Sequence, residues 1–288
     1  MIKHVGIVGA GTMGSGIAQV IALSKIDVAL YDVNATLQRQ GIERIQAELR
    51  RGIQKGKLKQ EQMTEAMERI RLKTSISDLG HCDLVLEAVV EDLKVKKDLF
   101  RHLEQNSKPT TIFATNTSSL SITSIAAGLA NPDRLVGLHF FNPAHIMKLV
   151  EVIRGETTGE EVLQSSVEFI THLGKTPVLV KDIPGFIVNR IARPFYGEAL
   201  RLAGEHVATI EQIDRITRST GGFAMGPFEL MDLIGIDVNL AVTQSMYDQN
   251  FGEPRYRPHP IQKRMVESGS LGKKTRRGFY SYEDLNTI

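Results

Sequence analysis

The chain has 288 residues, of which 42% are hydrophobic and 24% are charged, as in an ordinary globular protein with room for about two domains. The 35 basic and 33 acidic side chains leave a net charge of +2, so no global field favours nucleic acid or a membrane as partner. Cys82 is the only cysteine, which excludes an intrachain disulfide and suits a reducing compartment. We find neither an apolar run of about eighteen residues nor a charged-then-apolar leader, and expect a cytoplasmic location.

The first predicted elements enclose a glycine-rich turn. Residues 3–8 are typical of a buried strand, residues 15–23 of an apolar helix, and Gly9-Ala10-Gly11-Thr12-Met13-Gly14 lies between them. Gly9 permits the tight turn, Gly11 lets the backbone approach a pyrophosphate, and Gly14 lets the helix pack closely on the strand. The free N–H groups of the helix N-terminus then attract phosphates. The pattern predicts a dinucleotide-binding fold.

Asp32 follows the next predicted strand, residues 27–31, and lies eighteen positions after Gly14. A carboxylate at this distance accepts hydrogen bonds from the hydroxyl groups of the adenosine ribose. It also repels a 2′-phosphate at the same place. We therefore expect NAD rather than NADP as the cofactor.

A long polar stretch, residues 34–71, separates this strand from the next part of the sheet. Ile42, Ile45, Leu49 and Ile53 recur every three or four residues and predict one apolar helical stripe. The stretch is too long for a simple crossover, so we expect an inserted helical hairpin. Basic residues surround the stripe and gather near the hairpin tip: Arg44, Arg50, Arg51, Lys55, Lys57 and Lys59. Either a solvated face or a site for a phosphate-rich ligand fits this pattern.

The rest of the chain divides into an alternating part and a helical part. Strands are predicted at residues 83–89, 111–115, 135–139, 148–153 and 177–180, with helices at 93–103 and 121–129. Helices alone follow, at residues 187–203, 210–219, 230–247 and 260–267. We predict an α/β fold with a Rossmann-like, doubly wound, mostly parallel sheet (residues 1–183), followed by an all-α domain (residues 184–288).

Polar residues 115–119 (Thr-Asn-Thr-Ser-Ser) follow a predicted buried strand. Ligands of open parallel sheets bind outside the carboxyl ends of the strands, so these groups are expected to face the cofactor crevice. One Ser or Thr could also cap the helix that follows. The two roles are compatible, since a cap needs only one residue.

His139 ends another predicted strand, and Asn142-Pro143 marks a turn after it. If the chain doubles back there, Glu151 on the next strand comes opposite His139. A buried carboxylate beside an imidazole fixes its tautomer, as an acid/base catalyst requires. A lone histidine in a strand is more often structural, but the turn and the returning acid favour the catalytic interpretation.

The segment 182–190 (Asp-Ile-Pro-Gly-Phe-Ile-Val-Asn-Arg) lies at the predicted domain junction. A Pro-Gly hinge before a helix would place Asn189 and Arg190 near an interdomain cleft, where substrate pockets usually lie. The alternative is a linker and a capped helix, with Arg190 paired to an acid.

These motifs together resemble the L-3-hydroxyacyl-CoA dehydrogenase family over nearly the whole chain. The resemblance rests on the glycine turn and on residues 91–96, 116–119, 139–143, 148–152, 182–190, 225–230 and 278–280. It implies an enzyme that oxidises a 3-hydroxyacyl-CoA thioester with NAD and dimerises through its helical domain. It implies no metal.

The resemblance also suggests roles for single residues. His139 resembles the family's base and Glu151 its partner, and Ser118 would bind the C3 oxygen. Asn142 and Asn189 would help to hold the substrate. Glu91, Lys96 and Asn116 match positions that contact the nicotinamide end of the cofactor, and Arg51 and Lys55 lie on the hairpin that meets CoA in relatives.

Two residues depart from the family pattern. His145 stands where relatives usually have proline, and could alter the acyl pocket, and Arg276 stands where glycine is frequent.

Three alternatives to the short-chain enzyme remain open. Residues 189–196 resemble relatives that act on 3-hydroxyadipyl-CoA, and Arg193, one turn after Asn189, could bind a distal carboxylate. Arg193 could instead pair with an acid such as Glu198 or Asp232. A non-enzymatic NAD-binding protein is disfavoured by the intact catalytic residues, and a nucleic-acid module by the near-neutral charge.

Overall fold

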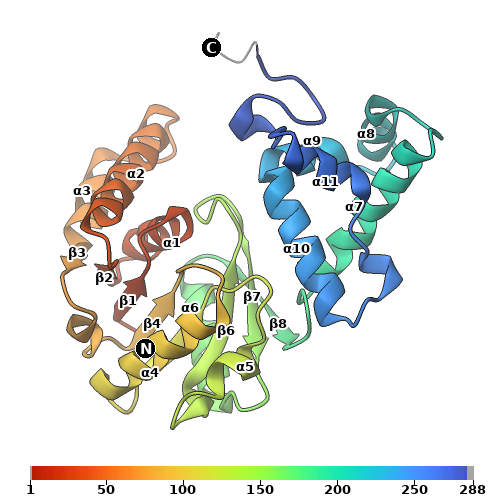
Figure 1. Ribbon diagram of the computed structural model, residues 1–288. Coiled ribbons are helices and arrows are strands. Elements are labelled where there is room, and N and C mark those ends of the chain that lie inside the picture. The colour runs from red at the N-terminus through yellow and green to blue at the C-terminus, as the bar shows by residue number, and fades with distance from the viewer. Residues whose placement is uncertain (1, 284–288) are drawn as a thin grey trace. The chain divides into compact units, whose positions relative to one another are not determined.

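The computed structural model describes residues 2–283. The chain forms two compact units, Met1–Phe186 (the first unit) and Ile187–Ile288 (the second unit), shown in Figure 1. Among the described residues, no helix is long and apolar enough to cross a membrane.

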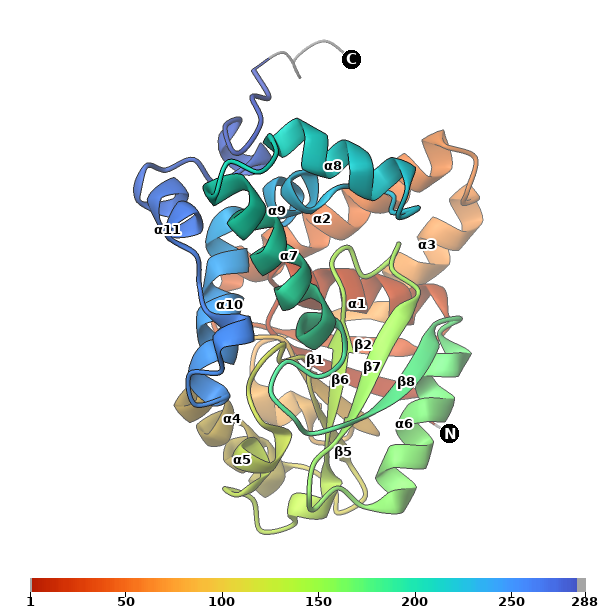
Figure 2. The ribbon, with the colours of Figure 1, turned by 90° about the vertical axis from the view of Figure 1, so that its right-hand side faces the viewer.

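The first unit is built on a mostly parallel sheet with the strand order β3-β2-β1-β4-β5-β6-β7-β8. Only β6 and β7 are antiparallel to each other, and β8 pairs with β7 in parallel at the edge seen in Figure 2. The strands are β1 His4–Val8, β2 Asp27–Tyr31, β3 Ile70–Lys73, β4 Leu84–Glu87, β5 Ile112–Thr115, β6 Leu135–Phe140, β7 Leu149–Arg154 and β8 Thr176–Lys181. The predicted doubly wound, mostly parallel sheet is confirmed.

Helices cover both faces of this sheet, so each face has its own hydrophobic core. One core joins Val5 and Ile7 to residues of α1, α2, α3 and α6, and the other joins Val85 and Phe113 to residues of α4 and α5. The helices are α1 Thr12–Leu23, α2 Ala35–Gln54, α3 Gln60–Arg69, α4 Leu93–Asn106, α5 Ile122–Ala126 and α6 Glu160–His172. Helix α6 was not predicted from the sequence.

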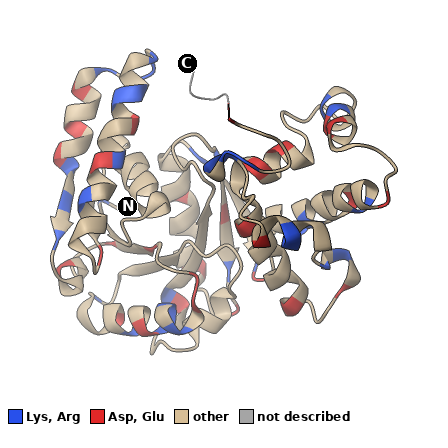
Figure 3. Cartoon of the chain, turned by 45° about the horizontal axis from the view of Figure 1, so that its top comes forward, with Lys and Arg blue, Asp and Glu red and all other residues tan. Residues whose placement is uncertain are grey.

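The predicted helical hairpin between strands is formed by α2 and α3. Ile45 and Leu49 of the predicted stripe are fully buried in the core that α2 shares with α1 and α3, while Ile42 and Ile53 are half-buried. The turn at residues 55–59 carries three exposed lysines. Figure 3 shows blue Lys and Arg segments toward the tip of this hairpin. The hairpin therefore presents its basic end to solvent.

The second unit is helical, and apart from isolated bridges its described residues form no strand. Its helices are α7 Val188–Gly204, α8 Ile210–Ser219, α9 Pro227–Ile234, α10 Ile236–Gln249 and α11 Pro260–Glu267. The single helix predicted over residues 230–247 was wrong, because the chain breaks at Gly235. That residue has φ +103°, a conformation that a continuous helix cannot contain. Tyr196, Leu200, Phe228 and Met231 form the core of the unit.

Candidate active site

The glycine-rich turn joins β1 to α1 with little room for side chains. Gly9 has φ +101°, and a Cβ atom there would lie 2.5 Å from the Ala88 carbonyl oxygen. A Cβ atom on Gly14 would overlap the carbonyl oxygen of Gly9. At Gly11 the same atom would meet nothing within 4 Å, so the space in front of the α1 N-terminus is open. This cradle fits a pyrophosphate bound by backbone N–H groups.

Asp32 lies at the end of β2, beside this cradle. Its Oδ2 accepts a hydrogen bond from Ala10 N (2.8 Å), and its Oδ1 accepts one from Asn34 N (3.0 Å). A cavity of about 840 Å³ opens here, and its lining includes Gly9, Gly11, Thr12, Met13, Asp32, Val33, Val89 and Leu99. A mostly apolar cavity in which backbone N–H groups orient the Asp32 carboxylate suits the adenosine half of NAD.

His139 and Glu151 face each other on the antiparallel strands β6 and β7. The predicted reversal of the chain is confirmed, because the two residues are register partners and His139 Nδ1 lies 2.7 Å from Glu151 Oε2. His139 is 6% exposed and Glu151 1%. The Phe141 and Phe186 rings pack near the imidazole, at centroid distances of 4.4 and 5.9 Å. An ionised Glu151 can only accept a hydrogen bond, so Nδ1 then carries the proton and Nε2 is left as a base.

Ser118 lies on a loop that the carboxylate of Glu91 holds in place. Glu91 Oε1 accepts hydrogen bonds from Thr117 Oγ1 (2.5 Å) and from the backbone N–H groups of Ser118 (3.0 Å) and Ser119 (3.2 Å). Burial alone would raise the pKa of Glu91, but Lys96 and these hydrogen bonds outweigh burial and hold the pKa below its ordinary 4.5. Glu91 therefore orients the loop through its ionised form.

Lys96 is buried between two carboxylates rather than exposed on its helix. Its Nζ lies 2.5 Å from Glu87 Oε1 and 3.2 Å from Glu91 Oε2, and its side chain is 1% exposed. Glu87, which the sequence analysis missed, is fully buried and also accepts a hydrogen bond from Thr115 Oγ1 (2.7 Å). The sequence signal that could have identified Glu87 is its position as an acid at the carboxyl end of an otherwise apolar strand.

The remaining polar candidates lie at strand ends and in the second unit. Asn116 Oδ1 accepts a hydrogen bond from Phe140 N (2.8 Å), which ties the ends of β5 and β6 together. Asn142 precedes a cis proline and lines a cavity between α1 and α2. Asn189 lies in the first turn of α7. Among the described residues, no cluster of His, Cys, Asp and Glu could hold a metal ion.

Arg51 and Lys55 are separated by one helical turn near the end of α2. Arg51 Nη1 pairs with Glu48 Oε1 (2.5 Å), and its side chain is 64% exposed. Lys55 is exposed and has no ion pair among the described residues.

Arg193 lies in α7 and is 5% exposed. Neither acid named as a possible partner pairs with it, because Glu198 binds Arg201 and Asp232 accepts backbone N–H groups of the 279–280 segment. Instead, Arg193 Nη1 donates to Asn239 O (2.9 Å) and Thr243 Oγ1 (3.1 Å).

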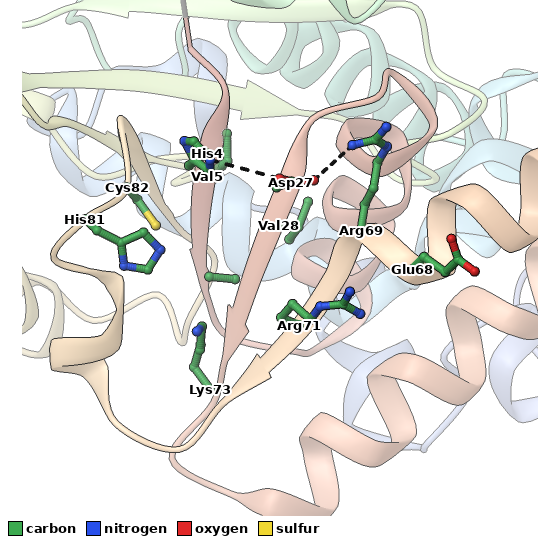
Figure 4. A pocket seen from close by; sticks show the side chains of 11 residues that line it. His4, Val5, Asp27, Val28, Glu68, Arg69, Arg71, Lys73, His81 and Cys82 are labelled. Atoms are coloured by element: carbon green, nitrogen blue, oxygen red, sulfur yellow. Dashed lines mark hydrogen bonds and ion pairs between the residues drawn. The ribbon is translucent and has the colours of Figure 1, made fainter.

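A separate hollow at the β3 edge of the sheet, shown in Figure 4, contains none of the predicted site residues. Its charges have both signs, and Arg69 pairs with Asp27 at 3.0 Å. Burial, with a smaller contribution from Asp83, raises the pKa of the Cys82 thiol to about 11. Cys82 is therefore a protonated, buried thiol and not a nucleophile.

Known families match both units of this structure. Residues 4–183 match the NAD binding domain of 3-hydroxyacyl-CoA dehydrogenase, and residues 185–282 match the C-terminal domain of that enzyme. The chain belongs to the 3-hydroxyacyl-CoA dehydrogenase family. It is accordingly an NAD-dependent oxidoreductase that acts on acyl-CoA substrates.

Individual relatives differ in the substrate that their names give. The chain is 47% identical to the 3-hydroxyadipyl-CoA dehydrogenase of Escherichia coli, and the match covers 98% of this chain but 59% of that relative. It is 43% identical to the 3-hydroxybutyryl-CoA dehydrogenase of Bradyrhizobium diazoefficiens, over 100% of this chain and 98% of the relative. The crystal structure of (S)-3-hydroxybutyryl-CoA dehydrogenase from Ralstonia eutropha superposes with a TM-score of 0.93 at 40% identity, covering 99% and 100% of the two chains.

Proposed function

We propose that this 3-hydroxyacyl-CoA dehydrogenase oxidises L-3-hydroxybutyryl-CoA reversibly to the 3-ketoacyl-CoA, with His139 as the acid/base catalyst. The observation that carries the proposal is the buried hydrogen bond between His139 and Glu151. A buried carboxylate beside an imidazole supports a role in proton transfer, because it fixes the tautomer and stabilises the charged form of the ring. The assignment to a four-carbon chain is supported by the relatives of similar length that carry this name.

In the proposed reaction, bound NAD supplies the acceptor for the hydride that leaves C3. His139 Nε2 removes the proton of the C3 hydroxyl group, and the electron pair of that O–H bond becomes the second bond of the C3 carbonyl. Glu151 stabilises the imidazolium that forms, and the Ser118 hydroxyl hydrogen-bonds the C3 oxygen. Asn142 and Asn189 help to hold the substrate.

Replacing His139 with alanine tests the proposal. We expect kcat to fall by about two to four orders of magnitude, the usual contribution of a positioned acid/base. NADH binding, measured by fluorescence, should persist because His139 is not part of the glycine turn. His172→Ala, on the exposed face of α6, is the matched control and should retain wild-type kcat. A His139→Ala enzyme with near-normal kcat on acetoacetyl-CoA contradicts the assignment.

Asp32 is proposed to set the preference for NAD over NADP. Its carboxylate forms charge-assisted hydrogen bonds to the ribose hydroxyls and repels a 2′-phosphate. We expect kcat/KM for NADH to exceed that for NADPH, and Asp32→Ser to narrow the gap chiefly through KM. Equal kcat/KM values for the two cofactors in the wild-type enzyme are the contrary result.

A second candidate substrate is 3-hydroxyadipyl-CoA, which has a distal carboxylate. It is favoured by Arg193, which has no carboxylate partner among the described residues, and by the name of the E. coli relative. If Arg193 binds that carboxylate, Arg193→Met lowers kcat/KM for 3-hydroxyadipyl-CoA at least about tenfold and spares 3-hydroxybutyryl-CoA. Equal losses on both substrates leave the short-chain proposal in place.

We further propose that Arg51 and Lys55 contact the phosphates of CoA. We also propose that residues 1–183 form the cofactor-binding domain, and that residues 184–288 form a domain through which two chains make a homodimer. Ile191, Leu233 and Val238 of the second unit are 69%, 47% and 47% exposed, which supports a covered apolar surface. Light scattering that finds a monomer at micromolar concentration contradicts the dimer.

A further inference from the structure

A cavity of about 360 Å³ lies between α1, α2 and the loop 142–146, within the first unit. Thr12 lines this cavity and also the cofactor cavity, so the two adjoin. Its polar lining comes from both helices and the loop: Thr12, Ser15, Gln19, Arg44, Glu48, Arg51, Asn142 and His145. The cavity thus runs from the loop after His139 to the cationic end of α2.

Glu48 stands between two basic side chains of this cavity. Its Oε1 lies 2.5 Å from Arg51 Nη1, and its Oε2 lies 3.7 Å from His145 Nε2. Arg44 is committed elsewhere, because its Nη2 donates to Ala10 O at 2.6 Å. Arg51 is therefore the cation of the cavity that a ligand could take over, and Glu48 is its present partner.

The position of His145 is fixed by the loop that carries it. Lys175 Nζ donates to the carbonyl oxygens of Ala144 (2.6 Å) and Met147 (2.8 Å), on either side of His145. The imidazole is held within reach of Glu48 on α2 by these two bonds. The charged groups that face it are Glu48, Arg44 and Arg51 from α2 and Lys175 from the segment before β8.

We propose that Glu48 is an internal counter-ion that the CoA phosphates displace from Arg51, and that His145 receives the displaced carboxylate. The inference rests on the proposed contact between Arg51 and CoA. A phosphate beside Arg51 repels Glu48, since the two anions compete for one guanidinium. His145 offers that carboxylate the nearest other partner.

The exchange changes the protonation of His145. Burial lowers its pKa below the ordinary 6.5, Glu48 opposes this effect and Lys175 adds to it, so at pH 7 the free enzyme holds His145 mainly neutral. A carboxylate that moves onto the imidazole stabilises the charged form, so CoA binding takes up a proton there. This proton uptake makes the His145 contribution to CoA affinity larger at lower pH.

Binding of free coenzyme A, measured by calorimetry, tests this exchange without the catalytic step. In Glu48→Gln, Arg51 has no counter-ion, and we expect the Kd to fall about two- to fivefold, the size of an exposed ion pair. Glu43→Gln, an exposed position on α2 outside the cavity, makes the same charge change and should bind as the wild type does. Pantetheine, which lacks the phosphates, should bind all variants alike.

Proton uptake on binding, obtained in two buffers of different ionisation enthalpy, tests the role of His145. The wild type should take up more protons near pH 6.5 than His145→Gln or Glu48→Gln, while the titration of the CoA phosphate is common to all three. Equal uptake in the wild type and His145→Gln, or a Glu48→Gln enzyme that binds CoA no more tightly, overturns the inference. Arg51→Gln distinguishes failure of the counter-ion exchange from failure of the proposed contact between Arg51 and CoA. If this variant binds CoA as tightly as the wild type does, Arg51 does not contact CoA.

Discussion

Two buried cations, one in each unit, are neutralised in different ways. Lys96 lies between Glu87 and Glu91, so its partners are two carboxyl groups. Arg193 has only neutral acceptors on α10, and the Tyr196 ring lies 4.8 Å from its guanidinium carbon. Burial lowers the pKa of Arg193 to about 10, which still leaves it charged at neutral pH. Lys96 is therefore bound into a charge network that reaches the Ser118 loop, whereas Arg193 belongs to a network of neutral groups.

Removing Lys96 should lower the free energy of unfolding more than removing Arg193 does. Lys96→Met leaves the fully buried Glu87 carboxylate without its cation, and we expect a loss of about 3–5 kcal/mol in the free energy of unfolding, measured with urea. Lys94→Met, on the exposed face of the same helix, is the control and should change stability little.

A second variant keeps this prediction open to contradiction if Lys96→Met fails to fold. Lys96→Met combined with Glu87→Leu removes both buried charges, and it should recover most of the lost stability. A single variant within about 1 kcal/mol of the wild type would show that Glu87 is not held by Lys96.

The contrast also shows what the sequence could predict. His139 and Glu151 were paired correctly because they lie twelve residues apart on adjacent antiparallel strands, where one turn fixes the register. The glycine turn and Asp32 were predicted for the same reason, since both lie within one short β-α-β segment of the sequence. Sequence patterns of this kind report contacts that the backbone geometry of one supersecondary unit determines.

The cluster around Lys96 and the partners of Arg193 were not predictable in this way. Glu87 reads as part of an apolar strand, and Lys96 as one of several lysines on a solvated helix. Arg193 was matched to acids by chemistry, but its acceptor Asn239 lies 46 residues away, and the packing of α7 on α10 decides that contact. The partners of a buried charge come from segments that tertiary packing brings together, so the local sequence pattern does not reveal them.

Acid stability should distinguish the two networks. Because the folded pKa of Glu91 is lowered, its contribution to stability is complete above the unfolded value of 4.5 and is lost as the pH falls through the folded pKa. We expect Glu91→Gln to lose less stability than the wild type between about pH 5 and 3, by under 1 kcal/mol since the side chain is 36% exposed. Arg193→Met should follow the wild-type pH profile, because Arg193 does not titrate there. Parallel profiles for Glu91→Gln and the wild type would show that Glu91 is not ionised through this interaction.

A small effect is also expected for Arg193→Met at neutral pH, within about 1 kcal/mol of the wild-type free energy of unfolding. Methionine fills a similar volume, and the change strands no buried carboxylate. Asn239 O keeps a donor, because Thr243 Oγ1 donates to it at 2.8 Å. Arg193 Nε is buried without an acceptor among the described residues, so its removal also relieves a desolvation cost. A loss above about 3 kcal/mol would mean that the neutral acceptors and the Tyr196 ring stabilise this cation as strongly as two carboxylates stabilise Lys96.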